Sequence, residues 1–128
     1  MNKRCYELPV GGEKVRLRLT MAGQRALREQ WDEDILSFLL TAAGDPARLC
    51  ALLTETLNWP ESGNALTDGG ALYDALVDEG WQGQTRFAAL AFQIGVVSGV
   101  LTAKQAGQLT DAVEQTFAEA FTGLTGHD

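Results

Sequence analysis

The hydrophobic repeat of this chain changes at Thr20 from a period of two residues to one of about 3.6. Before that point, apolar and polar residues alternate on both sides of Gly11-Gly12, a pair that suits a two-residue turn because both positions can take positive φ. We therefore expect a β-hairpin over residues 4–19, with one apolar face to bury and one basic face. Pro9, which lacks an N–H donor, places its strand at an edge. The tight turn also predicts the register: Val10 opposite Glu13, Leu8 opposite Val15, Tyr6 opposite Leu17, Glu7 opposite Arg16 and Cys5 opposite Arg18.

Beyond Thr20, apolar spacing and capping residues predict a helical region. Helices are expected to begin at Met21, after the acids of residues 32–34, at Pro46, after Thr67-Asp68, at Gln84 and after Thr102. The chain is thus predicted to be α+β but mostly α, an N-terminal β-hairpin followed by a bundle of five to six helices. We expect one domain over residues 1–128, with a helical body over 20–122 and a frayed tail over 123–128.

The last two expected helices have different patterns. Residues 84–98 are apolar nearly all round, which is typical of a helix surrounded by others. The final helix opens with a capping box between Thr102 and Gln105. It then carries an apolar residue at every fourth position: Leu109, Val113, Phe117 and Phe121.

Charge is divided unevenly between these two regions. Residues 1–28 carry +5 and residues 29–128 carry −12, for a net charge of −7. An acidic body argues against nucleic-acid binding, because phosphate contacts need clustered positive charge. The bases gather on one hairpin face and on the helix that follows it: Lys14, Arg16, Arg18, Arg25 and Arg28. Two interpretations stay open for this basic edge, a well-solvated edge strand or a surface that docks another copy of the chain or an acidic partner.

The sequence points to a cytosolic protein. Its longest apolar stretch, residues 87–97, is too short to cross a bilayer, so we expect no membrane partner. The first residues lack the apolar core of a signal peptide. Cys5 and Cys50 are far apart and belong to no metal-binding or redox motif, which predicts reduced thiols.

Residues able to carry catalysis are sparse. The only histidine, His127, is next to the last residue, and neither cysteine has an identifiable base. The acidic pairs at 32/34 and 78/79 lack the alternation of a calcium loop and are better interpreted as helix-start and solvated residues. No phosphate-binding loop is present. We therefore expect a protein that is not an enzyme and uses no metal or cofactor.

Two tryptophans are candidate contact residues. Trp59 lies beside Pro60 in a turn-rich segment, and Trp81 follows Gly80. Each is interpreted either as a lid over the core or, if exposed, as an anchor for a partner.

The order of elements resembles a known family. A hairpin strand runs directly into a helix through Leu17-Arg18-Leu19-Thr20-Met21 and Ala26-Leu27-Arg28-Glu29. After a helical middle, a near-apolar helix closes in a small-residue turn and a Thr-capped helix follows, through residues 98–105, Leu109 and Val113. This arrangement is similar to that of the small tail assembly chaperones of long-tailed bacteriophages and related prophages.

The resemblance implies a non-enzymatic cytoplasmic protein that coats a long helical tape-measure protein until tail-tube subunits polymerise around it. It also implies contact between copies, for which the basic hairpin edge is the sequence candidate. The alternative class is an acidic protein-binding module, such as an anti-repressor or a nucleic-acid mimic, which predicts acids on one contiguous surface. A chaperone that shields the apolar stripe of a helical partner would need an accessible apolar groove instead.

Overall fold

The computed structural model describes residues 4–125, and side chains from 4 to 120. Two strands, β1 (Tyr6–Val10) and β2 (Glu13–Leu17), precede six helices: α1 (Met21–Trp31), α2 (Ile35–Ala42), α3 (Pro46–Leu57), α4 (Gly69–Asp78), α5 (Gln84–Val97) and α6 (Ala103–Thr125). The predicted fold class is confirmed. Helix α6 continues to Thr125, within the segment predicted as a frayed tail, and residues 126–128, including His127, lie outside the described residues.

The hairpin has the predicted register from Tyr6–Leu17 to Val10–Glu13, whereas the predicted pair Cys5–Arg18 lies outside the strands. β1 pairs antiparallel with β2, with Leu8 opposite Val15 and Tyr6 opposite Leu17. Gly11 and Gly12 both take positive φ, at 58° and 83°, as the turn requires. Leu8, Val15 and Leu17 are buried, so the apolar face packs on the helical body as expected.

Most helix starts are set by the predicted caps. The side chains of Thr20, Asp34 and Asp68 accept hydrogen bonds from backbone N–H groups in the first turns of α1, α2 and α4. Asp45 caps α3, with Pro46 as its first residue. The capping box at α6 is complete, because Thr102 N donates to Gln105 Oε1 at 2.9 Å and Gln105 N donates to Thr102 Oγ1 at 3.1 Å.

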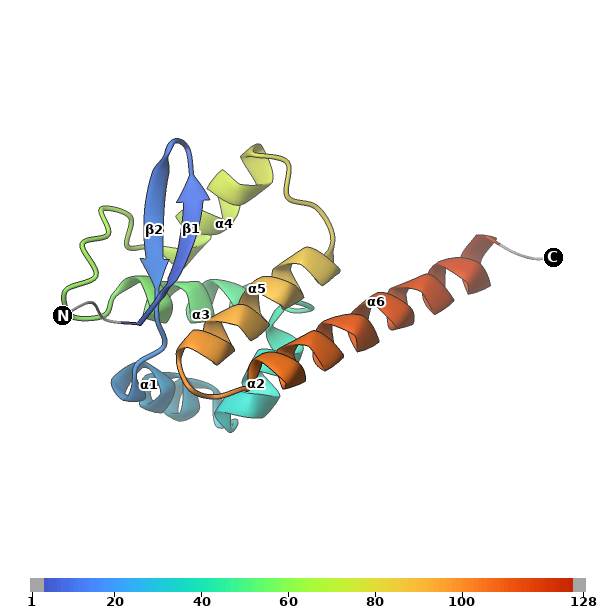
Figure 1. Ribbon diagram of the computed structural model, residues 1–128, viewed down its shortest axis with the longest axis horizontal. Coiled ribbons are helices and arrows are strands. Elements are labelled where there is room, and N and C mark those ends of the chain that lie inside the picture. The colour runs from blue at the N-terminus through green and yellow to red at the C-terminus, as the bar shows by residue number, and fades with distance from the viewer. Residues whose placement is uncertain (1–3, 126–128) are drawn as a thin grey trace.

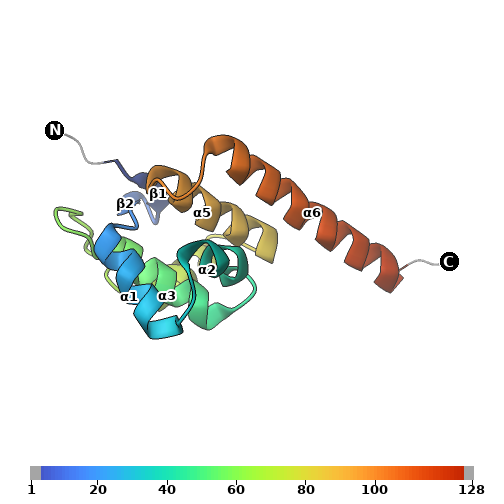
Figure 2. The ribbon, with the colours of Figure 1, turned by 90° about the horizontal axis from the view of Figure 1, so that it is seen from below.

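Helix α3 lies at the centre of the fold and contacts α1, α2, α4 and β2 (Figure 1). Its leucines Leu49, Leu52, Leu53 and Leu57 are no more than 2% exposed. α5 packs on the other side of the core, against α2, α6 and β1. The N-terminal part of α6 lies along α5, whereas its C-terminal part projects away from the rest of the molecule (Figures 1 and 2).

Within the described residues, no single helix is long and apolar enough to span a membrane. The consecutive helices α2 and α3 pass that test of length and composition only as a pair, with a bend of 119° between them.

Close packing of α4 on α3 depends on a glycine. A Cβ added to Gly69 would lie 2.1 Å from the backbone oxygen of Cys50 and 2.6 Å from the backbone nitrogen of Thr54. Gly69 N also donates to Thr54 Oγ1 at 2.8 Å. The first turn of α4 can therefore approach α3 this closely only without a side chain.

We predict that Gly69→Ala lowers the free energy of unfolding by about 1–3 kcal/mol or more, because α4 must move away from α3. Urea unfolding followed by circular dichroism measures the change. Gly107→Ala in α6 is the matched control, since a Cβ there would meet no atom within 4 Å. That control should be neutral or stabilising by up to about 1 kcal/mol. Equal stability of the Gly69 variant and wild type would contradict this role.

Candidate partner-binding surfaces

The basic side chains of the hairpin are engaged within the molecule. Lys14 Nζ and Arg16 Nε lie 3.6 Å and 3.7 Å from the carboxylate of Glu7 on the neighbouring strand. The guanidinium of Arg18 lies over the ring of Trp59, 5.8 Å from its centroid. Lys14 and Arg16 remain exposed, but part of their charge is offset by Glu7.

The outer edge of β2 is covered by the segment that follows α3. Asn64 Oδ1 accepts from Arg16 N at 2.8 Å, and Asn64 Nδ2 donates to Arg16 O at 2.7 Å. Trp59 Nε1 also donates to Arg16 O, at 3.0 Å, and Arg18 N donates to Thr56 O at 3.0 Å. At Arg16 and Arg18 the backbone groups that a further strand would need are therefore already paired.

The two candidate tryptophans also make internal contacts. Trp59 is 6% exposed, so it closes the core beside β2. Trp81 is half-buried, with its ring 5.3 Å from that of Phe87 and the Arg86 guanidinium 4.0 Å from its centroid. Both residues lie in the position that the lid interpretation describes.

The bases of α1 are placed differently from those of the hairpin. Arg25 and Arg28 are exposed, and neither forms an ion pair with a residue whose side chain is described. Together with Met21 and Ile35 they line a hollow of about 360 Å³ between α1 and the start of α2. We call this surface the α1–α2 hollow. Of its six lining residues two are apolar, Met21 and Ile35, and four are polar or charged, Gln24, Arg25, Arg28 and Asp34.

A second hollow is a groove between α2 and α6, which we call the apolar groove. It has a volume of about 260 Å³, and its apolar lining residues are Leu36, Leu40, Leu101 and Leu109. Leu36 is 45% and Leu40 46% exposed, although both are large and apolar. The remaining lining is the neutral amides of Gln105 and Gln108, so no charged residue lines this groove.

The sequence led us to expect an apolar groove for a chaperone, but it did not indicate where the groove lies or which residues line it. Residues 35–40 contain five large apolar side chains in an eight-residue helix, and an isolated short helix cannot bury all of its sides. Leu36 and Leu40 share a face one turn apart, as do Leu109 and Val113. The four-residue spacing within each pair is the sequence pattern from which the two apolar faces could have been predicted.

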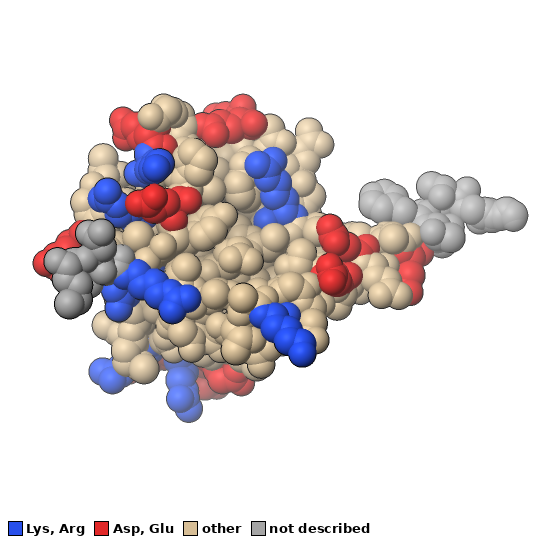
Figure 3. Space-filling model, in the orientation of Figure 1, with Lys and Arg blue, Asp and Glu red and all other residues tan. Residues whose placement is uncertain are grey.

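The projecting part of α6, residues 112–120, forms what we call the arm. Leu109, Val113 and Phe117 are only half-buried. Where the arm leaves the body, it borders a hollow of about 320 Å³ that Leu40 and Gln84 also line. On the face shown in Figure 3, both charge signs are interspersed over the body, whereas the arm shows acidic side chains only.

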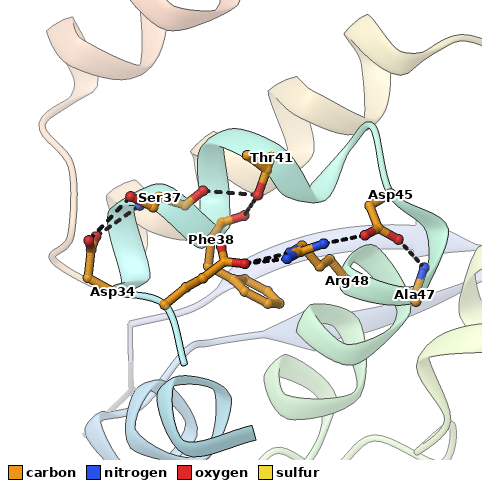
Figure 4. Close-up of polar contacts among 8 residues, drawn as sticks. Asp34, Ser37, Phe38, Thr41, Asp45, Ala47 and Arg48 are labelled. Carbon is orange, nitrogen blue, oxygen red and sulfur yellow. Dashed lines mark hydrogen bonds and ion pairs between the residues drawn. The ribbon is translucent and has the colours of Figure 1, made fainter. Parts of the chain in front are cut away.

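The acidic residues near α2 are used as caps and ion pairs (Figure 4). Asp34 accepts from Ser37 N at 3.0 Å and Ser37 Oγ at 3.2 Å, and these hydrogen bonds, with the charge of Arg28, lower its pKa. Desolvation alone would raise the pKa of Asp45, but hydrogen bonds from Arg48 and Ala47 outweigh it and lower that pKa. Arg48 bridges Asp45 and Glu33, and both contacts raise the pKa of its guanidinium.

Residues that could carry metal or thiol chemistry do not converge. Among the described residues, no group of three or more His, Cys, Asp or Glu side chains is placed to hold a metal ion. Cys5 and Cys50 are free thiols. Partial burial of Cys50, together with the charges of Asp68 and Asp74, raises the pKa of its thiol and so disfavours the nucleophilic thiolate.

Comparison of the chain with protein-family models, with curated proteins and with solved structures found no match.

We predict that stability falls as the pH drops through about 4, partly through Asp34 and Asp45. Their pKa values are lowered on folding, so the unfolded chain takes up protons first as the pH falls. Their contribution is complete above the ordinary carboxyl range and is lost below it. Urea midpoints measured between about pH 3 and 7 should therefore decline less steeply for Asp34→Asn/Asp45→Asn. Asp111→Asn, at a residue that caps no helix, is the matched control, and an unchanged slope in the double variant would contradict the assignment.

Proposed function

We propose that this chain is a non-enzymatic cytoplasmic binding protein that shields the apolar stripe of a long helical partner, as tail assembly chaperones shield a tape-measure protein. The apolar groove is the observation that carries the proposal. The resemblance in element order supports the choice of partner class.

The groove has the chemistry of a site for an amphipathic helix. Leu36 and Leu40 stand one turn apart on α2 and face Leu101 and Leu109 across the groove. A helix laid in such a groove presents apolar side chains at positions i, i+3, i+4 and i+7. Covering the exposed parts of Leu36 and Leu40 would contribute about 1 kcal/mol for each residue.

The neutral lining of the groove also fits the apolar stripe of a helix better than a charged ligand. Neutral amides border it, so neither a polyanion nor a strongly basic partner finds a complementary group there. An acidic mimic would bind through its carboxylates, whereas the groove binds through leucines. We therefore place the partner contact at the groove rather than at the acidic surface.

Gene context gives the first test. We predict a slippery heptamer near the 3′ end of the coding sequence, followed by a very long reading frame that encodes a helical protein. Genes of small-molecule metabolism in that position would contradict the proposal.

The second test changes the groove while leaving the core intact. Leu36→Lys/Leu40→Lys should fold normally, because both side chains are already about half exposed. The variant should lose at least about tenfold in affinity for the product of the downstream reading frame, since charge replaces apolar contact. Co-expression followed by solubility assay and titration measures this loss.

Val77→Lys provides the matched control, because Val77 on α4 is 44% exposed and lies outside the groove. That variant should keep the affinity of wild type. Equal binding by the groove variant and wild type would overturn the proposal.

A further inference from the structure

Two partly exposed surfaces lie at opposite ends of the molecule. The arm projects from one end, and α1, with the α1–α2 hollow, lies near the other (Figures 1 and 2). One chain therefore cannot place its own arm in its own hollow. Contact between these surfaces requires two copies.

The arm is an amphipathic acidic helix with part of its apolar side uncovered. Val113 and Phe117 stand one turn apart and are half-buried. At about 100° per residue, Glu114 emerges about 80° from the centre of that apolar stripe and so flanks it, whereas Glu119 lies about 140° from the centre on the other side, toward the outer face of the arm. Neither carboxylate forms an ion pair within the described residues, and residues 105–120 contain no lysine or arginine.

The α1–α2 hollow has the complementary chemistry. Met21 is 67% exposed, the most exposed of the large apolar side chains described, and lies with Ile35 in the hollow. Arg25 and Arg28 follow Met21 at i+4 and i+7, so both emerge beside it on one face of α1. Asp34 also lines the hollow, but its carboxylate is occupied as the N-cap of α2.

We propose that the arm of one copy docks in the α1–α2 hollow of a second copy, so that the chain assembles head to tail. The stripe of Val113 and Phe117 covers Met21, and the flanking Glu114 approaches Arg25 and Arg28, while Glu119 adds negative charge on the outer face of the arm. Because the two contacting surfaces are different and lie at opposite ends, each added copy leaves one arm and one hollow free. The product is an open row of copies.

This contact does not rest on the proposed function. The hollow uses Ile35 on the α1 side of α2, whereas the apolar groove uses Leu36 and Leu40 on the α6 side. Self-assembly is measured with this chain alone. Its failure would leave the groove proposal standing, and failure of the groove proposal would leave the self-contact standing.

Charge reversal tests the contact by sedimentation velocity at low ionic strength. Wild type should increase in mean mass with concentration and return toward the monomer as salt is added. Arg25→Glu/Arg28→Glu should remain monomeric, and so should Glu114→Lys/Glu119→Lys. An equimolar mixture of the two variants should associate again, because each surface then meets one of opposite charge.

Lys14→Glu/Arg16→Glu is the matched control, since it changes the net charge of the chain by the same amount through the hairpin. This control should associate like wild type. A monomeric wild type at high concentration and low salt would overturn the proposal. So would a mixture that fails to associate, or loss of assembly in the hairpin variant with assembly retained in the α1 variant.

Discussion

Burial of α3 is the constraint on which the rest of the structure depends. Its leucines are covered on every side, which requires α1, α2, α4 and the hairpin to converge on one twelve-residue helix. Thr56 on the same helix accepts the backbone N–H of Arg18, so α3 also holds the end of β2 by a hydrogen bond. Gly69 lets the backbone of α4 come into contact with the backbone of α3. A two-stranded hairpin is marginal by itself, and α3 supplies the apolar surface that keeps it folded.

This arrangement leaves α2 with two different sides. Phe38, Leu39 and Ala42 face the core, and a helix of eight residues has too few positions to bury the remainder. Ile35 therefore borders the α1–α2 hollow, while Leu36 and Leu40 border the apolar groove. Both proposed contacts use apolar residues of α2 that the core does not cover, and the two surfaces lie on different sides of this short helix. A protein that lines a rod in many copies needs both a contact to the rod and a contact to its neighbour.

Most basic side chains of the hairpin are offset by residues that lie directly beside them. Glu7 offsets Lys14 and Arg16, and Trp59 covers one face of Arg18, so the hairpin retains less free positive charge than its composition suggests. Arg25 and Arg28 form no ion pair with a described side chain, although the charge of Arg28 acts on Asp34 and helps to lower its pKa. The proposed self-contact joins Arg25 and Arg28 on α1 to the acidic arm, which lies at the opposite end of the molecule (Figure 1).

Local features were predictable from the sequence because they depend on neighbours along the chain. The hairpin register follows from Gly11-Gly12, and the helix starts follow from caps such as Thr20 and Asp34, each satisfied within three residues. Only the tertiary structure decided which apolar residues stay exposed and which bases stay free. Leu40 is half exposed in a groove that α6 also lines, and Arg18 is covered because Trp59, 41 positions further along the sequence, packs beside β2. Such contacts between distant segments are set by packing of the whole core, and no local pattern records them.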